Sequence, residues 1–247
     1  MGFATLMYHE IRTKEEFNPE HPSTIDVKQD YHDTLPSPLF VTLEHFEEQM
    51  DYLHKENYHM LTLDEVKDYY YQGKELPDKS ILITFDDCFQ SLKRYAYPVL
   101  KQYGFHAAAF VVTSWLHDKP KEFNSDQSVT LTKSDLEEMT DVFQYANHTN
   151  AFHQRTDEKT SMMMATSDEE FSKDLDKCNE YVQVKDVFAF PFGLYNERNV
   201  NLLKEKGFTL AFTTTTGKNE RNTDPLYLKR NAIPYFIELD AFKKIVG

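Results

Sequence analysis

The chain has 247 residues, with 41 acidic and 27 basic side chains, a formal net charge of −14 and a sequence pI near 5.1. So negative a surface repels phosphate groups, which argues against nucleic acid as a partner, and no apolar stretch reaches the roughly 18 residues of a membrane-spanning helix. The two cysteines, Cys88 and Cys178, exclude a disulfide scaffold. The length suits one domain over residues 1–247, and its N-terminus lacks the basic start of a signal peptide.

Short apolar runs alternate with amphipathic helical segments, which is typical of a parallel α/β architecture. Several of these runs are apolar throughout, as expected of strands buried on both faces. Two helices begin with the Ser/Thr-x-x-Glu pattern of a capping box, at Thr62 and at Ser167, and another helix over 92–103 ends at Gly104. A further helix is indicated by the apolar spacing of Leu43, Phe46, Met50 and Leu53. The predicted strands are 3–8, 81–85, 107–113, 142–146, 187–190, 208–213 and 227–232.

Two segments depart from this alternation. Residues 12–38 are polar and contain four prolines, which predicts a surface loop over one end of the domain. Residues 156–166 include three consecutive methionines and are expected to form a second loop or a mobile flap.

Polar side chains follow three of the predicted strands. His9 follows the first strand, the pair Asp86-Asp87 follows 81–85, and His148 follows 142–146 with His153 close behind. The carboxyl ends of the strands in a parallel barrel meet at one face, so these side chains are expected to converge there. Two imidazoles and one carboxylate make a three-ligand set of the kind found in catalytic zinc sites. Alternatively, the aspartate pair caps the following helix, and the histidines are unrelated surface residues.

These residues resemble the ordered motifs of the polysaccharide deacetylases with a NodB-homology domain. The motifs are Thr84-Phe85-Asp86-Asp87, then His148-Thr149 with His153, then Phe190-Pro191-Phe192-Gly193. The resemblance implies a distorted (β/α)7-type barrel. Many members carry a catalytic histidine near the C-terminus, whereas here no histidine follows His153 and Leu6-Met7-Tyr8-His9 lies at the N-terminus. That arrangement is similar to the permuted poly-N-acetylglucosamine deacetylases of biofilm systems.

The resemblance also implies roles for individual residues. Asp87, His148 and His153 would hold a divalent metal, with zinc expected. Asp86 would be the general base that deprotonates the metal-bound water, and His9 the general acid that protonates the departing amine. The backbone N–H of Phe192 would help to hold the oxyanion.

Three positions depart from the family pattern. Cys88 stands where the family has glycine, and its thiol could pack in the core, add a fourth ligand or be a redox liability. Ala189 replaces the arginine that orients the catalytic aspartate, so Arg230 could pair with Asp86 from another strand, or be purely structural. The family's later tryptophan has no obvious counterpart, since Trp115 follows a different strand and could line a sugar groove or lie in the core.

The expected function is removal of N-acetyl groups from an N-acetylglucosamine-containing polysaccharide of cell wall or biofilm. Such a substrate would be met outside the membrane, although no export signal or stable membrane insertion is expected from this chain. One alternative is an amidase with the same fold that acts on a small non-sugar amide. Another is an inactive carbohydrate-binding homologue, which only the departures at Cys88 and Ala189 support.

Overall fold

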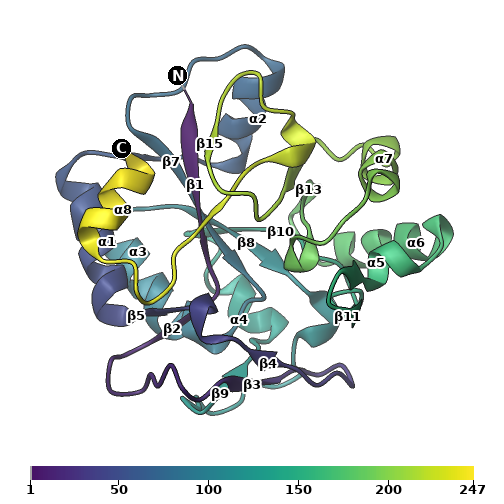
Figure 1. The fold of residues 1–247 in the computed structure, drawn as a ribbon, viewed down its shortest axis with the longest axis horizontal. Helices are drawn as coiled ribbons and strands as arrows, with labels where there is room; N and C mark the ends of the chain where they lie inside the picture. Colours follow the sequence, from purple (N-terminus) through teal and green to yellow (C-terminus); the bar gives the residue numbers. More distant parts are fainter. Residues whose placement is uncertain (1) are drawn as a thin grey trace.

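The fold is organised around a curled nine-stranded sheet, seen in the computed structural model, which describes residues 2–247 (Figure 1). The main path runs β14-β13-β10-β8-β7-β1-β15, with β6 paired to β7 and β16 paired to β1. Every pairing in this sheet is parallel except that of β15 with β1. The strands are β1 (Phe3–Tyr8), β6 (His59–Met60), β7 (Ser80–Asp86), β8 (Ala107–Val111), β10 (Phe143–Asn147), β13 (Val184–Ala189), β14 (Leu210–Phe212), β15 (Lys218–Asn219) and β16 (Asn231–Ala232).

The segment that follows β15 draws the two edges of the sheet together. Leu228 bridges to Phe212 of β14, and a few residues later β16 pairs with Leu6 and Met7 of β1. The predicted strand 227–232 therefore occupies a strand position, but only its last two residues form a regular ladder. This curled, barrel-like sheet confirms the predicted fold class.

Six of the helices lie in two groups around the sheet (Figure 1). α1, α3 and α8 lie together on one side, and α5, α6 and α7 lie on the other. The capping boxes predicted at Thr62 and Ser167 are both present, at the starts of α2 and α6, and a π-helical turn over Leu92–Ala96 leads into α3. The helices are α1 (Leu43–Lys55), α2 (Leu63–Tyr71), α3 (Tyr97–Tyr103), α4 (Lys133–Glu137), α5 (Met162–Ala165), α6 (Asp168–Asn179), α7 (Glu197–Glu205) and α8 (Leu239–Val246).

The two-residue period of β7 decides which of its side chains reach the interior of the curled sheet. Ile81, Ile83 and Phe85 belong to the core cluster that also contains side chains of α1, α3 and α8. Leu82 belongs to a different cluster with residues of β8, β13 and β14. Because alternate residues share a face, Asp86 lies on the same side as Leu82, toward the interior.

The segment 12–38 was expected to be a loop, and that prediction is wrong in part. It contains β3 (Ser23–Asp26) and β4 (Thr34–Leu35), which form a three-stranded sheet with β9 (Gln127–Val129). Just before it, β2 (Glu10–Arg12) pairs with β5 (Phe40–Thr42). The partner strand β9 lies about a hundred residues away in sequence, so no local pattern could indicate the pairing.

The segment 156–166 is likewise more ordered than a loop. A hairpin of β11 (Arg155–Asp157) and β12 (Thr160–Ser161) leads directly into α5. Met163 is completely buried among the side chains of α6 and α7, which explains the methionine run as packing rather than as a flap. Within residues 2–247, no helix combines the length and apolar character needed to cross a bilayer.

Candidate metal and catalytic site

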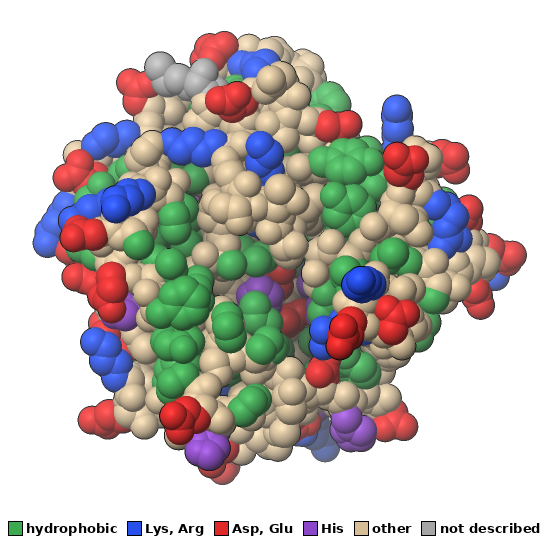
Figure 2. Space-filling view, in the orientation of Figure 1, with side chains coloured by type: hydrophobic (Ala, Val, Ile, Leu, Met, Phe, Trp, Pro, Cys, Tyr) green, Lys and Arg blue, Asp and Glu red, His purple; other side chains and the backbone are tan. Residues whose placement is uncertain are grey.

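The side chains predicted to converge do lie in one pocket at the carboxyl ends of the parallel strands. The walls of the pocket include residues of the segment 12–38, such as Ile25 and Leu35. Figure 2 shows histidine and acidic side chains recessed among hydrophobic side chains near the middle of this face. Its polar lining includes all six predicted side chains: His9, Asp86, Asp87, His148, His153 and Arg230.

Asp87, His148 and His153 form a group that could hold a metal ion. One ligand atom from each lies within 4.8 Å of the others, and all three residues are buried. Asp87 Oδ1 has no hydrogen-bond partner, although a buried carboxylate oxygen without a partner is costly. His148 Nδ1 lies 2.8 Å from the carbonyl oxygen of Ala189, which leaves Nε2 free as a ligand. The donors and the unpartnered oxygen therefore fit a divalent cation.

The pKa shifts of the three candidate ligands also favour a bound cation. Burial lowers the pKa of His148 and His153, so both imidazoles are neutral and able to ligate. Burial, together with the neighbouring Asp86 carboxylate, raises the pKa of Asp87. A cation at this position would relieve both causes, because it stabilises the ionised carboxylate.

Asp86 is held by a buried, two-pronged ion pair with Arg230. Nη1 and Nη2 of Arg230 lie 2.6 and 2.8 Å from Oδ1 and Oδ2 of Asp86, and Nε donates to the carbonyl of Thr213. Of the two alternatives considered for Arg230, the structure shows the pairing with Asp86. Burial by itself would raise the pKa of Asp86, but Arg230 holds it well below its usual range. Asp86 consequently stays ionised beside a second carboxylate, and neither aspartate caps a helix.

His9 completes the polar lining from the end of β1. Its Nε2 lies 3.7 Å from Asp86 Oδ2, and His148 Nε2 lies 3.9 Å from the same oxygen. Burial lowers the pKa of His9 to about 4, although the Asp86 carboxylate opposes the shift. The imidazole is therefore neutral at rest.

Backbone strain is concentrated at this site. Asp87, Cys88, Thr149 and Phe192 all have positive φ between 56° and 75°, a region that costs a non-glycine residue roughly 1–2 kcal/mol. The Asp87 and Cys88 amides donate to the carbonyls of Phe110 and Asp86, which stabilises the turn. Cys88 is fully buried in the main core and is not among the metal-ligand atoms, so packing accounts for it.

Aromatic side chains form one wall of the pocket. The Phe192 ring centroid lies 4.3 Å from that of His153, and the Trp115 ring centroid lies 4.6 Å from it. Trp115 is almost fully buried, in agreement with the core role considered for it, and its side chain also lines the pocket. Gly193 must be glycine, because a Cβ there would lie 2.0 Å from Thr214 Oγ1.

Several residues that support the site carry no motif. Asp174 of α6 accepts hydrogen bonds from the amides of Asn150 and Ala151, which lie between the two histidine ligands. Arg155 and Asp33 form an ion pair of 3.5 Å at the pocket wall, joining the β11–β12 hairpin to the segment 12–38. Nothing local in the sequence marks these residues, since their partners are distant along the chain.

Comparisons with known proteins point to one family. The family model described as polysaccharide deacetylase matches residues 73–211. A poly-beta-1,6-N-acetyl-D-glucosamine N-deacetylase of Staphylococcus aureus is 28% identical over 213 residues, covering 83% of this chain and 70% of that protein. The protein of the same name from Staphylococcus epidermidis is 27% identical, covering 98% of this chain and 81% of its own length.

Solved structures share the whole fold. The deacetylase PplD of Streptococcus pyogenes, in complex with acetate, superposes with a TM-score of 0.78 at 21% identity, covering 100% of this chain and 99% of its own. IcaB from Ammonifex degensii gives a TM-score of 0.73, also at 21% identity, covering 100% and 97%. The chain belongs to the polysaccharide deacetylase family. Within it, the chain resembles the poly-N-acetylglucosamine deacetylase subgroup, which confirms the resemblance drawn from the motifs.

The Asp86–Arg230 pair should be required for stability. We expect Arg230→Met to lower the free energy of unfolding by about 3–5 kcal/mol, because it leaves the Asp86 carboxylate buried without a counter-ion. The double variant Arg230→Met/Asp86→Asn should lose less, since no charge is then orphaned. Urea denaturation at pH 7 measures both, and a double variant less stable than the single one would contradict this account.

Asp174 should make stability depend on pH. Burial raises the pKa of Asp174 from its ordinary value of 3.8 to about 6, against the opposing effect of its two backbone hydrogen bonds. Between these two pH values the folded state keeps a proton that the unfolded state releases. The contribution of Asp174 to the free energy of unfolding therefore falls by about 3 kcal/mol as the pH rises from about 4 to 6. In Asp174→Asn this contribution is absent. The stability of the variant relative to the natural protein should therefore rise with pH over that range, and a flat difference between the two urea-denaturation curves would refute the assignment.

Proposed function

We propose that this protein is a metal-dependent hydrolase that removes N-acetyl groups from an N-acetylglucosamine-containing polysaccharide. The observation that carries the proposal is the pairing, in one pocket, of a three-ligand group with an unpartnered carboxylate oxygen and a second carboxylate kept ionised by Arg230. A structural metal site would not require that second carboxylate, nor His9 beside it. The names of the staphylococcal relatives supply the substrate class.

Asp87, His148 and His153 would hold the metal, and two nitrogen ligands with one oxygen ligand suit zinc. When bound, such a cation lowers the pKa of a coordinated water and polarises the amide carbonyl. The protein's part is to keep both imidazoles neutral, which burial achieves, and to fix the orientation of His148, which the Ala189 carbonyl achieves.

Asp86 acts as the general base in this proposal. Its carboxylate is ionised at neutral pH, and Arg230 fixes its orientation through both oxygens. Oδ2 faces the imidazoles of His9 and His148, at 3.7 and 3.9 Å. This oxygen is therefore the one placed to accept a proton from the attacking water.

His9 acts as the general acid. The neutral His9 imidazole carries no proton on Nε2 when that nitrogen is the acceptor. His9 must therefore gain a proton there before it can act as an acid. The pKa of His9 is about 4, while that of Asp86 is held well below its usual range, so a proton taken up by Asp86 passes favourably to Nε2 of His9. His9 can then protonate the amine as the C–N bond breaks.

The pocket also suits a sugar. Phe192 lines the pocket and is only partly buried, so it offers aromatic surface against which an apolar sugar face can pack. The Phe192 backbone N–H is proposed as the donor to the oxyanion, because the left-handed conformation of this residue sets the direction of its peptide groups.

The defining experiment pairs metal analysis with acetate release from β-1,6-linked N-acetylglucosamine oligomers. We expect about one divalent metal per chain, acetate release that chelation abolishes, and recovery on adding zinc. Asp87→Asn should lose metal and activity together. Asp86→Asn should lose turnover by roughly 10²-fold or more yet keep its metal, because only the base is removed.

The other outcomes separate the alternatives. Metal without acetate release would favour an amidase acting on a small molecule. Absence of metal in freshly purified protein, and failure to bind added zinc, would favour a carbohydrate-binding role. Loss of metal in Asp86→Asn would overturn the assignment of Asp86 as base rather than ligand.

His9 can be tested through the leaving group. His9→Ala should slow amide hydrolysis by roughly 10²–10⁴-fold, because an amine must be protonated to leave. Hydrolysis of an activated acetyl ester, whose leaving group needs no proton, should fall far less. Steady-state rates on an N-acetylated sugar and on a nitrophenyl acetate give the comparison, and equal losses on both substrates would exclude the acid role.

A further inference from the structure

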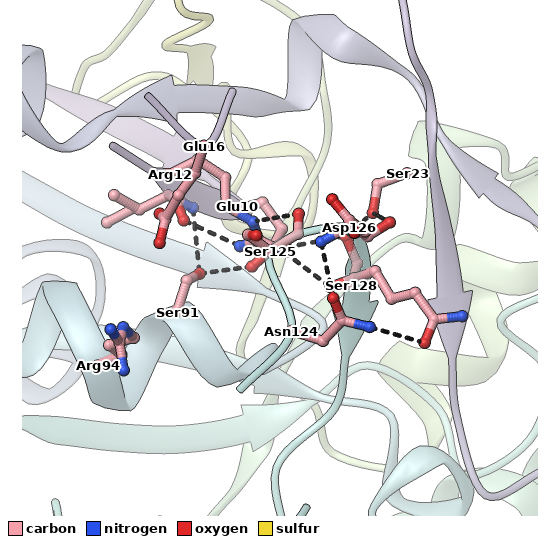
Figure 3. A network of polar contacts seen from close by, with 12 residues as sticks. Glu10, Arg12, Glu16, Ser23, Ser91, Arg94, Asn124, Ser125, Asp126 and Ser128 are labelled. Carbon is pink, nitrogen blue, oxygen red and sulfur yellow. Dashed lines mark hydrogen bonds and ion pairs between the residues drawn. The ribbon is translucent and has the colours of Figure 1, made fainter. Parts of the chain in front are cut away.

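A second buried ion pair lies immediately after His9 and outside the pocket (Figure 3). Glu10 and Arg12 are both essentially inaccessible to solvent, and Arg12 Nη2 lies 2.5 Å from Glu10 Oε2. Arg12 is further held by the carbonyls of Ile11, Ser125 and Gln127. Its guanidinium also lies over the rings of Phe40 and Phe123.

The Glu10 carboxylate joins two other segments of the chain through serine hydroxyls. Ser91 donates to Oε1 at 2.6 Å, and Ser128 of β9 donates to Oε2 at 2.9 Å (Figure 3). Ser91 also accepts a hydrogen bond from the amide of Ile11. Both serines are fully buried, so Glu10 is bound on both oxygens without water being needed.

The three connected segments differ in their relation to the candidate catalytic residues. Glu10 directly follows His9, and Ser91 lies at the start of the helix that follows the turn at Asp87 and Cys88. Ser128 lies instead on the small sheet formed with β3. The Glu10–Ser91 hydrogen bond therefore joins the segment that carries the proposed acid to the helix that directly follows the proposed base and metal ligand.

Such a tie is needed because the strand ladder ends just before the site. The last paired residues of β1 and β7 are Tyr8 and Phe85. Beyond them the chains diverge: β2 pairs with β5, while the other chain turns sharply at Asp87 and Cys88. Main-chain pairing between these two strands thus stops one residue short of His9 and of Asp86.

We propose that Glu10 is a positioning residue, which sets the His9 imidazole against the Asp86 carboxylate through its hydrogen bond with Ser91. The expected effect on the hydrolysis rate rests on the proposed function. The expected effect on the position of the His9 side chain does not. On this proposal, the buried Glu10 side chain positions His9 as well as stabilising the fold. Ser128 serves as the internal comparison, because it donates to the same carboxylate from a segment that carries none of the proposed catalytic residues.

The test compares Ser91→Ala with Ser128→Ala, each of which deletes one hydroxyl from Glu10 and leaves the ion pair with Arg12 intact. Each variant also loses one further hydrogen bond, that of Ser91 with the Ile11 amide or that of Ser128 with Ser23. Urea denaturation should show a similar decrease in midpoint for both. Crystal structures should show the 3.7 Å separation between His9 Nε2 and Asp86 Oδ2 altered only in Ser91→Ala. Metal content should match the natural protein in both variants.

Kinetics then test the consequence. For Ser91→Ala we expect kcat on the N-acetylated sugar to fall about 10-fold or more relative to the activated ester, since small displacements of a catalytic group cost this much. Ser128→Ala should leave the amide-to-ester ratio unchanged, and Ser91→Thr, which keeps the hydroxyl, should restore it. A merely structural role would lower both rates together.

The outcomes are separable. An unmoved His9 in the crystal structure of Ser91→Ala, or equal changes of the amide-to-ester ratio in the two alanine variants, would overturn the positioning role. A displaced His9 in a protein whose unaltered form hydrolyses neither substrate would support the positioning role and refute the proposed function instead.

Discussion

The ion pair between Asp86 and Arg230 is the interaction on which the rest of the site depends. Asp86 points into the curled sheet because of its place on β7, and Arg230 comes from the segment that draws β14 and β1 together. Neither charge could be buried without the other. Their pairing therefore links closure of the sheet to the charge state of the pocket, so that Asp86 is ionised although a second carboxylate follows it directly.

The surroundings of this pair are strained and tightly supported. Four residues around the pocket adopt left-handed backbone conformations that glycine would adopt more easily. Asp87 keeps an oxygen without a hydrogen bond, next to two neutral imidazoles. A fold optimised only for stability would avoid both features. They are understandable if these side chains have to meet at one point, where a cation and a substrate would supply the missing interactions.

Support for the site comes from polar groups placed behind it. Asp174 holds the turn between the two histidine ligands, and Glu10 joins the segment after His9 to the turn after Asp86. Both carboxylates are buried, and both bind groups of distant segments. Precise geometry at the pocket is thus obtained from a few buried hydrogen bonds that cross between strands where main-chain pairing has ended.

The sequence by itself determined the order of the strands, the capping boxes at Thr62 and Ser167, and the residues that stand directly after each strand. These follow from local periodicity and from the rule that parallel strands present their carboxyl ends at one face. Only the tertiary structure decided that β9 pairs with the segment 12–38, that Arg230 reaches Asp86, and that Glu10 meets Ser91 and Ser128. Those contacts join residues some 80 to 144 positions apart. Their energy appears only when the chain has folded, so no local pattern can reveal them.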